Sequence, residues 1–474
     1  MLFNSVTFVI FFLITYVLYV LLRHRAQNRM LLIASYVFYG WWDWRFLSLI
    51  FLSSVMDYFL SHAMHRSENA RVRRRLLLVS IAVNMGILCA FKYMGFFADS
   101  MAQLLANFGV ETPSFTFLHL VLPVGISFYT FQTMSYTIDV YRRQLAPARS
   151  LSNYLLYISF FPQLVAGPIE RASRLLPQIE NPRRVTYDMI RTGCWLILLG
   201  YFKKVVLADN LAPFTRELFA HPDQHHGLEI LLGIYAFAWQ IYGDFSGYSD
   251  IARGIARLLG VDLMENFRMP YLAISPSDFW RRWHIALSTW LRDYLYIPLG
   301  GNRGGPWRTH RNLFLTMLLG GLWHGARWNF IAWGAFHGLI LILQRFVEPS
   351  ITRFNERLGP RGKKLFRALG IVLFFQVTCI GWLLFGVIEI KDAATLAMNL
   401  FSPFALTGKV IALTLLCFAL PMFALNVLKE RAGGDLLAVK KWPPVVRLCV
   451  YLILFITILV FGVAGGNEFI YFQF

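Results

Sequence analysis

Apolar residues gather along this chain in blocks of about 20 positions, separated by short polar or basic stretches. The clearest blocks cover residues 2–22, 76–97, 190–207, 369–388, 410–428 and 446–463. A helix needs ~20 apolar residues to cross ~30 Å of hydrocarbon, whereas the strands of a membrane barrel would alternate apolar and polar positions. The pattern therefore predicts an all-α, polytopic integral membrane protein with roughly 10–12 transmembrane helices.

The first apolar block lacks a basic leader, and Arg23, Arg25 and Arg29 follow it. This order is typical of a first transmembrane helix whose N-terminus lies outside the cytoplasm, rather than of a cleaved signal peptide. Further basic residues cluster between the other blocks. We therefore expect a multi-pass protein whose basic loops are cytoplasmic.

Composition agrees with a membrane protein and restricts its partners. Of the 474 residues, 57% are hydrophobic and 15% are charged, and the formal net charge is +19. A soluble domain carries about a quarter charged residues. Because the basic residues lie in short loops beside apolar blocks, we interpret them as facing anionic lipid and expect no nucleic-acid partner.

The chain shows no internal repeat, low-complexity tract or long linker, which predicts a single membrane domain over residues 1–474. Its five cysteines are isolated in apolar segments, so we expect neither a disulfide framework nor a zinc site. His221, His225 and His226 belong to a polar loop and make a weak metal site. We therefore expect no metal.

Three stretches depart from the simple pattern. Residues 112–131 contain Pro113 and Pro123, and residues 160–182 are polar and broken by prolines. Irregular backbone at membrane depth occurs where protein or a water-filled cavity surrounds it, so either stretch could line a cavity or be a kinked helix followed by a surface loop. The third stretch, 242–310, is amphipathic and predicts an embedded or cytoplasm-facing layer.

Within that layer, the sequence SPSD at 275–278 predicts a helix start, with Ser275 as N-cap and Asp278 completing a capping box. A continuous helix from there would have an apolar face made of Trp280, Trp283, His284, Leu287 and Leu291. His284 is then either a core histidine hydrogen-bonded to a neighbour or a reactive group. The residues alone leave both interpretations open.

His324 lies in an apolar run, with Gly320 and Gly321 before it and Gly325 after it. Glycine permits close backbone approach and leaves room beside the imidazole. A histidine buried at membrane depth stays neutral, which is the form that a general base needs. We therefore favour a functional role for His324 over a simple bridge between helices. His337 has a similar local sequence and is interpreted as structural or supporting.

Residues 300–305, with the sequence GGNRGG, contain four glycines and a basic residue. Backbone N–H groups of such a stretch could hold a phosphate, with Arg303, Arg308 and Arg311 adding charge. The stretch matches neither a P-loop nor a dinucleotide fingerprint. We favour a basic cytoplasmic turn between helices.

With these residues in place, the chain resembles the membrane-bound O-acyltransferase family, and within it the branch of the alginate O-acetylation membrane subunit. The resemblance rests on DFSGYSD at 244–250, NF at 266–267, DFWRRWH at 278–284, WLRDY at 290–294, YIPLGGN at 296–302 and GLWHG at 321–325. The same pattern continues in PVGISF at 123–128, FPQ at 161–163, AGP at 166–168 and FIYFQF at 469–474. It covers nearly the whole chain, with its core at 242–338.

The resemblance implies a ring of tilted helices around a central funnel or tunnel, with additional amphipathic and re-entrant helices. It assigns the family's essential histidine to His324 and its second polar position to His284. Four further residues are expected to support the site: Trp323, Trp283, Asp250 and Asn266. We also expect four residues to bind the phosphates of coenzyme A: Arg281, Arg282, Asn302 and Arg303.

The resemblance further implies an O-acetyltransferase in the bacterial cytoplasmic (inner) membrane. It would pass an acetyl group from acetyl-CoA, a cytoplasmic thioester donor, across the membrane for O-acetylation of an extracytoplasmic polysaccharide such as alginate or cellulose. His324 would be the general base. The expected partners are acetyl-CoA or an acyl carrier, an extracytoplasmic acetyltransferase protein and membrane lipid, with no permanently bound cofactor.

Two alternatives stay open. The first is transfer of D-alanyl or another acyl group to a cell-envelope polymer. The second belongs to a different class, a transporter or a structural subunit of a polysaccharide complex. Intramembrane histidines also suit proton-coupled transport, but transporters usually show paired halves, and the sequence shows no internal repeat.

Overall fold

The computed structural model describes residues 1–110, 120–165, 167–402, 408–431, 442–463 and 469–470. Regular secondary structure in these residues is entirely helical, which confirms the predicted all-α class. The chain forms two compact units. Unit 1 comprises Met1–Ile197 and Ala252–Met264, and unit 2 comprises Leu198–Ile251 and Glu265–Phe474. Residues 112–119 of the first irregular stretch, Ala166 and residues 471–474 lie outside the described residues.

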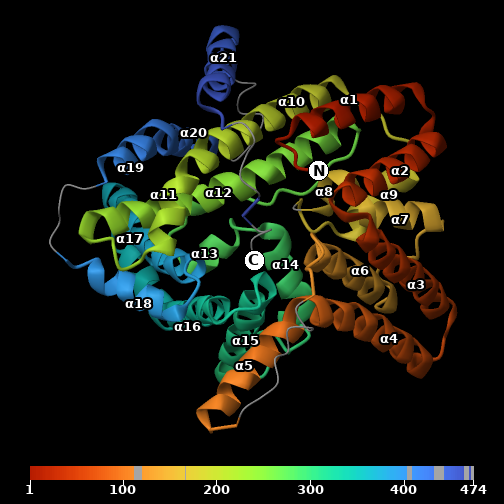
Figure 1. Cartoon of the computed structure of the whole chain (residues 1–474), viewed down its shortest axis with the longest axis horizontal. Helices are drawn as coiled ribbons and strands as arrows, with labels where there is room; N and C mark the ends of the chain where they lie inside the picture. Colours follow the sequence, from red (N-terminus) through yellow and green to blue (C-terminus); the bar gives the residue numbers. More distant parts are fainter. Residues whose placement is uncertain (111–119, 166, 403–407, 432–441, 464–468, 471–474) are drawn as a thin grey trace. The chain divides into compact units, whose positions relative to one another are not determined.

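Unit 1 is built from the N-terminal helices, coloured red to yellow in Figure 1. Its helices are α1 (Val6–Leu21), α2 (His24–Asp43), α3 (Leu47–Arg66), α4 (Ala70–Leu88), α5 (Met94–Asn107), α6 (Ile126–Tyr141), α7 (Leu151–Ser159), α8 (Phe161–Leu164), α9 (Ala172–Glu180) and most of α10 (Tyr187–Tyr201). Helix α3 packs against α4 and α6, and α2 packs against α7. Short 3₁₀ and π turns join α2 to α3 and α4 to α5.

A buried carboxylate ties three of these helices together. Asp57 on α3 is fully buried and accepts hydrogen bonds from Ser80 Oγ at 2.6 Å and Asn84 Nδ2 at 2.8 Å, both on α4. Thr133 on α6 donates to Asn84 Oδ1 at 3.2 Å. Hydrogen bonds to a buried carboxylate are among the stronger ones, so this network fixes the packing of the three helices.

The proline-broken stretch 160–182 forms two short helices, α8 and α9, with irregular backbone between them. Its described residues from Phe160 to Glu170 are buried. Glu170 accepts a hydrogen bond from the backbone N–H of Met264 within the same unit. Protein therefore surrounds the irregular backbone up to Glu170 and satisfies part of its polar groups, whereas Asn181 and Pro182 at the end of the stretch are exposed.

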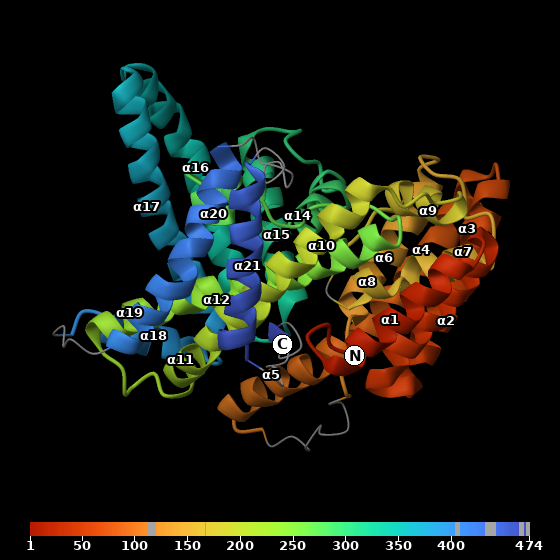
Figure 2. The ribbon, with the colours of Figure 1, turned by 90° about the horizontal axis from the view of Figure 1, so that it is seen from above.

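Unit 2 contains the other helices, green to blue in Figure 1. They are α11 (Asp209–Ala220), most of α12 (Gly227–Leu258), α13 (Pro276–Trp280), α14 (Ile285–Leu291), α15 (Pro306–His324), α16 (Trp328–Glu356), α17 (Pro360–Gly386), α18 (Ile390–Asn399), α19 (Lys409–Thr414), α20 (Leu420–Arg431) and α21 (Pro444–Phe461). Figure 2 shows α16 and α17 side by side as a long hairpin. Irregular π turns precede α11 and α20.

Six helical segments of the described chain are long and apolar enough to cross a membrane. They are His24–Arg66, Ala70–Asn107, Trp328–Glu356, Pro360–Gly386, Lys409–Arg431 and Pro444–Phe461. On α21, Ile453, Leu459 and Val460 are each more than 60% exposed, as expected of a helix that faces lipid. These segments confirm a polytopic membrane protein, while the count of 10–12 crossings and the ring around a funnel stay predictions.

The amphipathic layer predicted at 242–310 is made of short pieces after the end of α12. A 3₁₀ turn at Pro270–Leu272, α13, α14 and a π turn at Arg292–Tyr296 follow one another before α15 begins. Each described helix between Leu258 and Pro306 has seven residues or fewer. None of them is long enough to cross the membrane, which agrees with the predicted layer.

Candidate active site

Two glycines bring α15 and α16 into close contact. A Cβ atom on Gly334 would lie 2.5 Å from Met317 O and 3.2 Å from the Cα of Gly321, so no side chain fits at this crossing. A Cβ on Gly321 would collide with the carbonyl oxygen of Phe330. Gly321, three residues before His324, is therefore required for backbone contact between these two helices, as the sequence suggested.

His324 is the last residue of α15 and is only 3% exposed. Its ring lies 5.0 Å from Trp323, 5.0 Å from Trp333 and 5.5 Å from Phe385, measured between ring centroids and close to edge-on in each case. Three aromatic side chains thus enclose the imidazole. These rings, together with the 3% exposure, separate the imidazole from solvent.

The predicted helix through residue 284 is interrupted. Helix α13 ends at Trp280, and α14 begins only at Ile285. His284 between them has φ 42° and ψ 55°, in the left-handed region that a non-glycine residue rarely adopts. Ser275 does cap α13 by accepting from the N–H of Asp278 at 3.3 Å. The prediction of one continuous helix with a single apolar face is therefore wrong.

A neighbouring segment explains the interruption. The N–H of Arg268 donates to the carbonyl of Arg282 at 2.8 Å, and the N–H of Ile285 donates to the carbonyl of Asn266 at 2.9 Å. These bonds take backbone groups that a continuous helix would have used internally. The resulting left-handed residue is His284 itself, and strained backbone of this kind is concentrated at functional sites.

Asn266 determines which nitrogen of His284 carries the proton. Asn266 Oδ1 accepts from the N–H of Ala286 at 3.3 Å, and Nδ2 donates to Ser249 Oγ at 3.2 Å, so the atom facing His284 Nδ1 at 3.0 Å is an oxygen. His284 Nδ1 must therefore donate to it. Burial lowers the pKa of His284 to about 3, so the ring is neutral and its Nε2 carries a lone pair.

Trp323 lies against both histidines. Its ring centroid is 6.0 Å from His284 and 5.0 Å from His324. The structure thus brings together three of the predicted site residues, and Asn266 holds one of them. Trp283 lies in the wall beside them, 4.9 Å from Phe267 between ring centroids. We call the contacting side chains of His284, Trp323 and His324 the histidine pocket.

His337 contacts the same aromatic cluster one layer away. Its ring is 4.6 Å from Trp333, which also contacts His324, and 5.1 Å from Trp280. A Cβ atom on Gly381 of α17 would lie 3.1 Å from its Nε2, so α17 passes close to the ring at this glycine. This position, behind Trp333, agrees with a supporting role.

Asp250, the remaining predicted support residue, belongs to a group of buried charges. Lys203 Nζ lies 2.7 Å from Asp250 Oδ2, and Lys204 Nζ lies 2.8 Å from Asp244 Oδ1 and 2.9 Å from Asp209 Oδ1. We call these five residues the lysine–aspartate cluster. Burial opposes the charge of Lys204, but Asp244 and Asp209 raise its pKa above the ordinary value.

Sequence reasoning missed the two lysines of this cluster. They lie inside the apolar block 190–207. Two adjacent lysines are unusual in such a block, so the sequence itself indicated a buried polar site there. Both lysines lie in a π turn at Phe202–Ala208, which belongs to unit 2. The backbone N–H of Ile470 also donates to Asp244 Oδ2 at 2.6 Å, which adds a further partner.

The four residues predicted to bind coenzyme A lie on two different segments. Arg281 is exposed, whereas Arg282 is half-buried and paired with Asp278 at 2.9 Å and Glu430 at 3.1 Å. Asn302 and Arg303 are exposed in the turn before α15, where Asn302 accepts from Tyr296 Oη at 2.5 Å. Only the exposed members of the set present polar groups to solvent.

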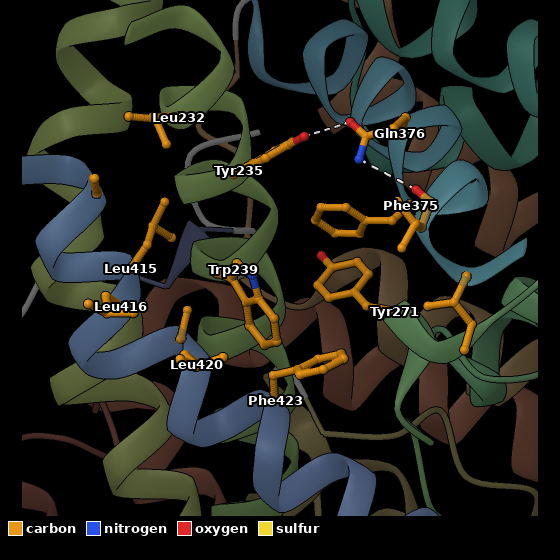
Figure 3. Close-up of a pocket in the computed structure, with 14 residues that line it drawn as sticks. Leu232, Tyr235, Trp239, Tyr271, Phe375, Gln376, Leu415, Leu416, Leu420 and Phe423 are labelled. Carbon is orange, nitrogen blue, oxygen red and sulfur yellow. Dashed lines mark hydrogen bonds between the residues drawn. The ribbon is translucent and has the colours of Figure 1, made fainter. Parts of the chain in front are cut away.

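Two cavities lined by described residues of unit 2 differ in character. A polar cavity of about 320 Å³ is lined by residues that include Lys204, Asp244, Gln240 and Arg327. Arg327 follows His324 by three residues, at the start of α16. An apolar cavity of about 440 Å³ lies between α12, α17 and the α19–α20 segment (Figure 3).

Comparison with known proteins identifies the class. The model of the membrane-bound O-acyltransferase (MBOAT) family matches residues 36–384, most of the chain. This protein therefore belongs to the membrane-bound O-acyltransferase family: it is a multi-pass membrane protein and an acyltransferase.

The chain is similar to several curated relatives. It is 38% identical to the probable alginate O-acetylase AlgI of Pseudomonas putida, over all of both chains. It is 42% identical to the protein of that name from Azotobacter vinelandii, over 85% of this chain and 78% of the relative. It is also 35% identical to the peptidoglycan O-acetyltransferase of Helicobacter pylori, over 83% of this chain and 78% of the relative.

Proposed function

We propose that this protein takes an acetyl group from acetyl-CoA on the cytoplasmic side and passes it across the membrane for O-acetylation of an extracytoplasmic polysaccharide. The observation that carries the proposal is the histidine pocket, in which two buried histidines contact one tryptophan. The family assignment and the names of the relatives, two of which are named probable alginate O-acetylases, support the choice of acyl group and acceptor.

The proposed reaction is attack of an acceptor hydroxyl on the thioester carbonyl. A new C–O bond forms, the C–S bond breaks, and the hydroxyl proton passes to His324 and then to the departing thiolate. His324 would act as general base because it is enclosed by rings that favour the neutral imidazole. The indole N–H of Trp323 would donate to the oxyanion that develops on the carbonyl oxygen.

The protonation of His284 limits its role. Its Nδ1–H is committed to Asn266, so a neutral ring offers a lone pair at Nε2 rather than a donor. We therefore assign His284 to orienting the attacking hydroxyl, and not to stabilising the oxyanion. Its unusual backbone would hold that lone pair in a fixed direction.

The direction of transfer rests on the charges of the α16–α17 hairpin. Arg353, Arg357, Arg361 and Lys363 lie around the turn that joins these helices, which we assign to the cytoplasm. The polar cavity lies at the opposite ends of the two helices, where Arg327 and Gly386 line it. We propose that the acceptor, or a partner protein that delivers the acyl group to it, reaches the site from that end.

Exposed basic residues are proposed to hold the phosphates of the donor. Arg281 and Arg303 are exposed and carry the positive charge that binds phosphate, whereas Arg282 forms ion pairs with Asp278 and Glu430. Arg282 would then position the segment before His284 rather than bind phosphate.

The experiment uses purified protein in lipid vesicles, with acetyl-CoA labelled in the acetyl group on one side only. The proposal predicts loss of label from the thioester when it faces the basic α16–α17 turn, and label on an oligosaccharide supplied on the other side. A carrier-protein thioester carrying D-alanine is offered in parallel. Use of that donor alone would replace acetyl transfer by D-alanyl transfer, and movement of a solute with no thioester consumed would indicate a transporter.

A further inference from the structure

The apolar cavity of unit 2 has walls that offer almost no polar group to a ligand. Its lining includes Leu232, Trp239, Phe375, Leu416 and Phe423, and Figure 3 shows these side chains around the space. The polar side chains of Tyr235 and Gln376 bond to each other, with Tyr235 Oη donating to Gln376 Oε1 at 2.7 Å. A hydrophilic ligand would lose its water without gaining partners here.

Two of the helical segments around the cavity are long and apolar enough to cross the membrane. Pro360–Gly386, which is α17, and Lys409–Arg431, which contains α19 and α20, are two of the six candidate membrane-spanning segments. Beside the lining residues, Leu373 on α17 and Leu413 on α19 are 66% and 60% exposed. At membrane depth such a surface meets the hydrocarbon chains of lipids, so these chains are the molecules available to enter the cavity.

The cavity is open on one side, because Val372, Leu416 and Leu420 of its lining are each more than half exposed. At membrane depth such an opening faces the hydrocarbon chains of lipids rather than water. A chain that enters the cavity would make dispersion contacts with the lining side chains. The cavity is about 440 Å³ and bounded by several aromatic rings, which suits a flexible chain better than a rigid polar group.

We propose that this cavity binds one hydrocarbon chain of a membrane lipid. The occupant is recognised by its chain, because the lining supplies no charged side chain for a headgroup. The bound chain lies behind the aromatic wall of the site: Tyr271 lines the cavity, and its ring is 6.3 Å from Trp283, the residue before His284. The proposal does not depend on which acyl group the enzyme transfers.

The test uses the full-length protein in vesicles of phosphatidylcholine that carries a diazirine in one acyl chain. After illumination, labelled residues are mapped by mass spectrometry. We expect label on the lining residues Tyr235 and Phe375, which are partly buried, in addition to the exposed residues that any surrounding lipid reaches. In Ala412→Trp, where the new indole enters the cavity, labelling of these residues should fall roughly tenfold.

The matched control is Leu413→Trp, because Leu413 is the next residue of α19, is exposed and does not line the cavity. It should leave the labelling of Tyr235 and Phe375 unchanged. Both variants are first compared with the natural chain in unfolding temperature. If Ala412→Trp unfolds, Leu416→Trp takes its place as the filling variant.

Two results would overturn the proposal. The first is label confined to outward-facing residues, with the same pattern in the natural chain and in the filling variant. The second is loss of label on adding palmitoyl-CoA but not on adding free phosphatidylcholine, which would make the occupant the chain of an acyl donor. Neither result would bear on acetyl transfer, which is measured separately with labelled acetyl-CoA.

Discussion

The histidine pocket and the lysine–aspartate cluster are both buried in unit 2, yet their surroundings are opposite. In the pocket, His324 is enclosed by aromatic rings, and His284 is neutral with one nitrogen held by Asn266. In the cluster, two ammonium groups face three carboxylates at 2.7 to 2.9 Å. One region surrounds its titratable groups with aromatic rings, whereas the other pairs charged groups with one another.

This difference separates reactivity from stability. A neutral imidazole can accept a proton. The apolar side chains around it pack against one another as well, so replacing the imidazole should change the free energy of unfolding little. A buried ion pair contributes little net stability when intact, but removing one partner leaves an uncompensated charge. Substitutions in the cluster should therefore unfold the protein, while substitutions in the pocket should leave it folded and reduce turnover.

The largest expected effect is on the cluster. Lys204→Met would leave Asp209 and Asp244 facing each other without their cation. We expect the free energy of unfolding to fall by about 3–5 kcal/mol, measured by thermal unfolding of the purified protein in lipid vesicles.

The control for this prediction is Lys391→Met. Lys391 forms an ion pair with Glu389 at 2.7 Å, but both side chains are exposed. Exposed pairs contribute little, so this variant should unfold like the natural chain. An equal loss of stability in both variants would contradict the expectation that the buried cluster, unlike the exposed pair, stabilises the fold.

The next effect concerns the tautomer of His284. Asn266→Ala removes the acceptor of its Nδ1–H, so the ring can adopt the other tautomer or rotate. We expect turnover to fall roughly tenfold to a hundredfold. The matched control is Asn28→Ala, since Asn28 is also buried but lies in unit 1, where it donates to the carbonyl of Ile179. A comparable loss in both variants would point to general destabilisation.

The third effect is the dependence of stability on pH. The pKa of His284 is about 3 in the folded protein, against ~6.5 for histidine in an unfolded chain. The contribution of the neutral ring to the free energy of unfolding is therefore complete above pH ~6.5. It is lost as the pH falls from there towards 3, because the unfolded chain binds the proton first. Between pH 7 and pH 5 we expect a loss of about 2 kcal/mol. In His284→Gln this part of the loss should be absent. If the free energy of unfolding depended on pH equally in this variant and in the natural chain, the ring of His284 could not be buried and neutral.

The smallest expected effect is on the donor. Arg281→Ala and Arg303→Ala change exposed side chains and should not alter folding. We expect the KM for acetyl-CoA to rise by about fivefold to tenfold in each, with kcat little changed, because an exposed phosphate contact contributes about 1 kcal/mol. Unchanged donor affinity in both variants would remove these residues from the donor site.

The sequence predicted the helices and the glycine contact beside His324, but not the interruption at His284 or the lysine–aspartate cluster. The six apolar blocks are all helical, although a π turn ends the block that contains Lys203 and Lys204. The glycines around His324 indicated close backbone contact, and the structure shows it between Gly321 and Gly334. Such features are local or follow from hydrophobicity, so the chain itself carries them.

The interruption at His284 could not be read from its own neighbourhood. A helical pattern continues through residues 280–291, but hydrogen bonds from the segment around Asn266 and Arg268 override it. The lysine–aspartate cluster likewise depends on residues more than 30 positions apart, as the Lys204–Asp244 pair shows. Tertiary contacts of this kind determine which polar groups meet, and a single sequence gives little indication of them.

The most direct test of the central claim compares His324→Ala with the natural chain in the same vesicles, supplied with labelled acetyl-CoA. His226→Ala serves as the control, because His226 is exposed in the loop before α12. We predict that both variants keep the unfolding temperature of the natural chain. Acyl transfer should fall by a factor of about 10²–10⁴ in His324→Ala only. Equal transfer by His324→Ala and the natural chain would contradict the account, because no other residue has been assigned to remove the proton.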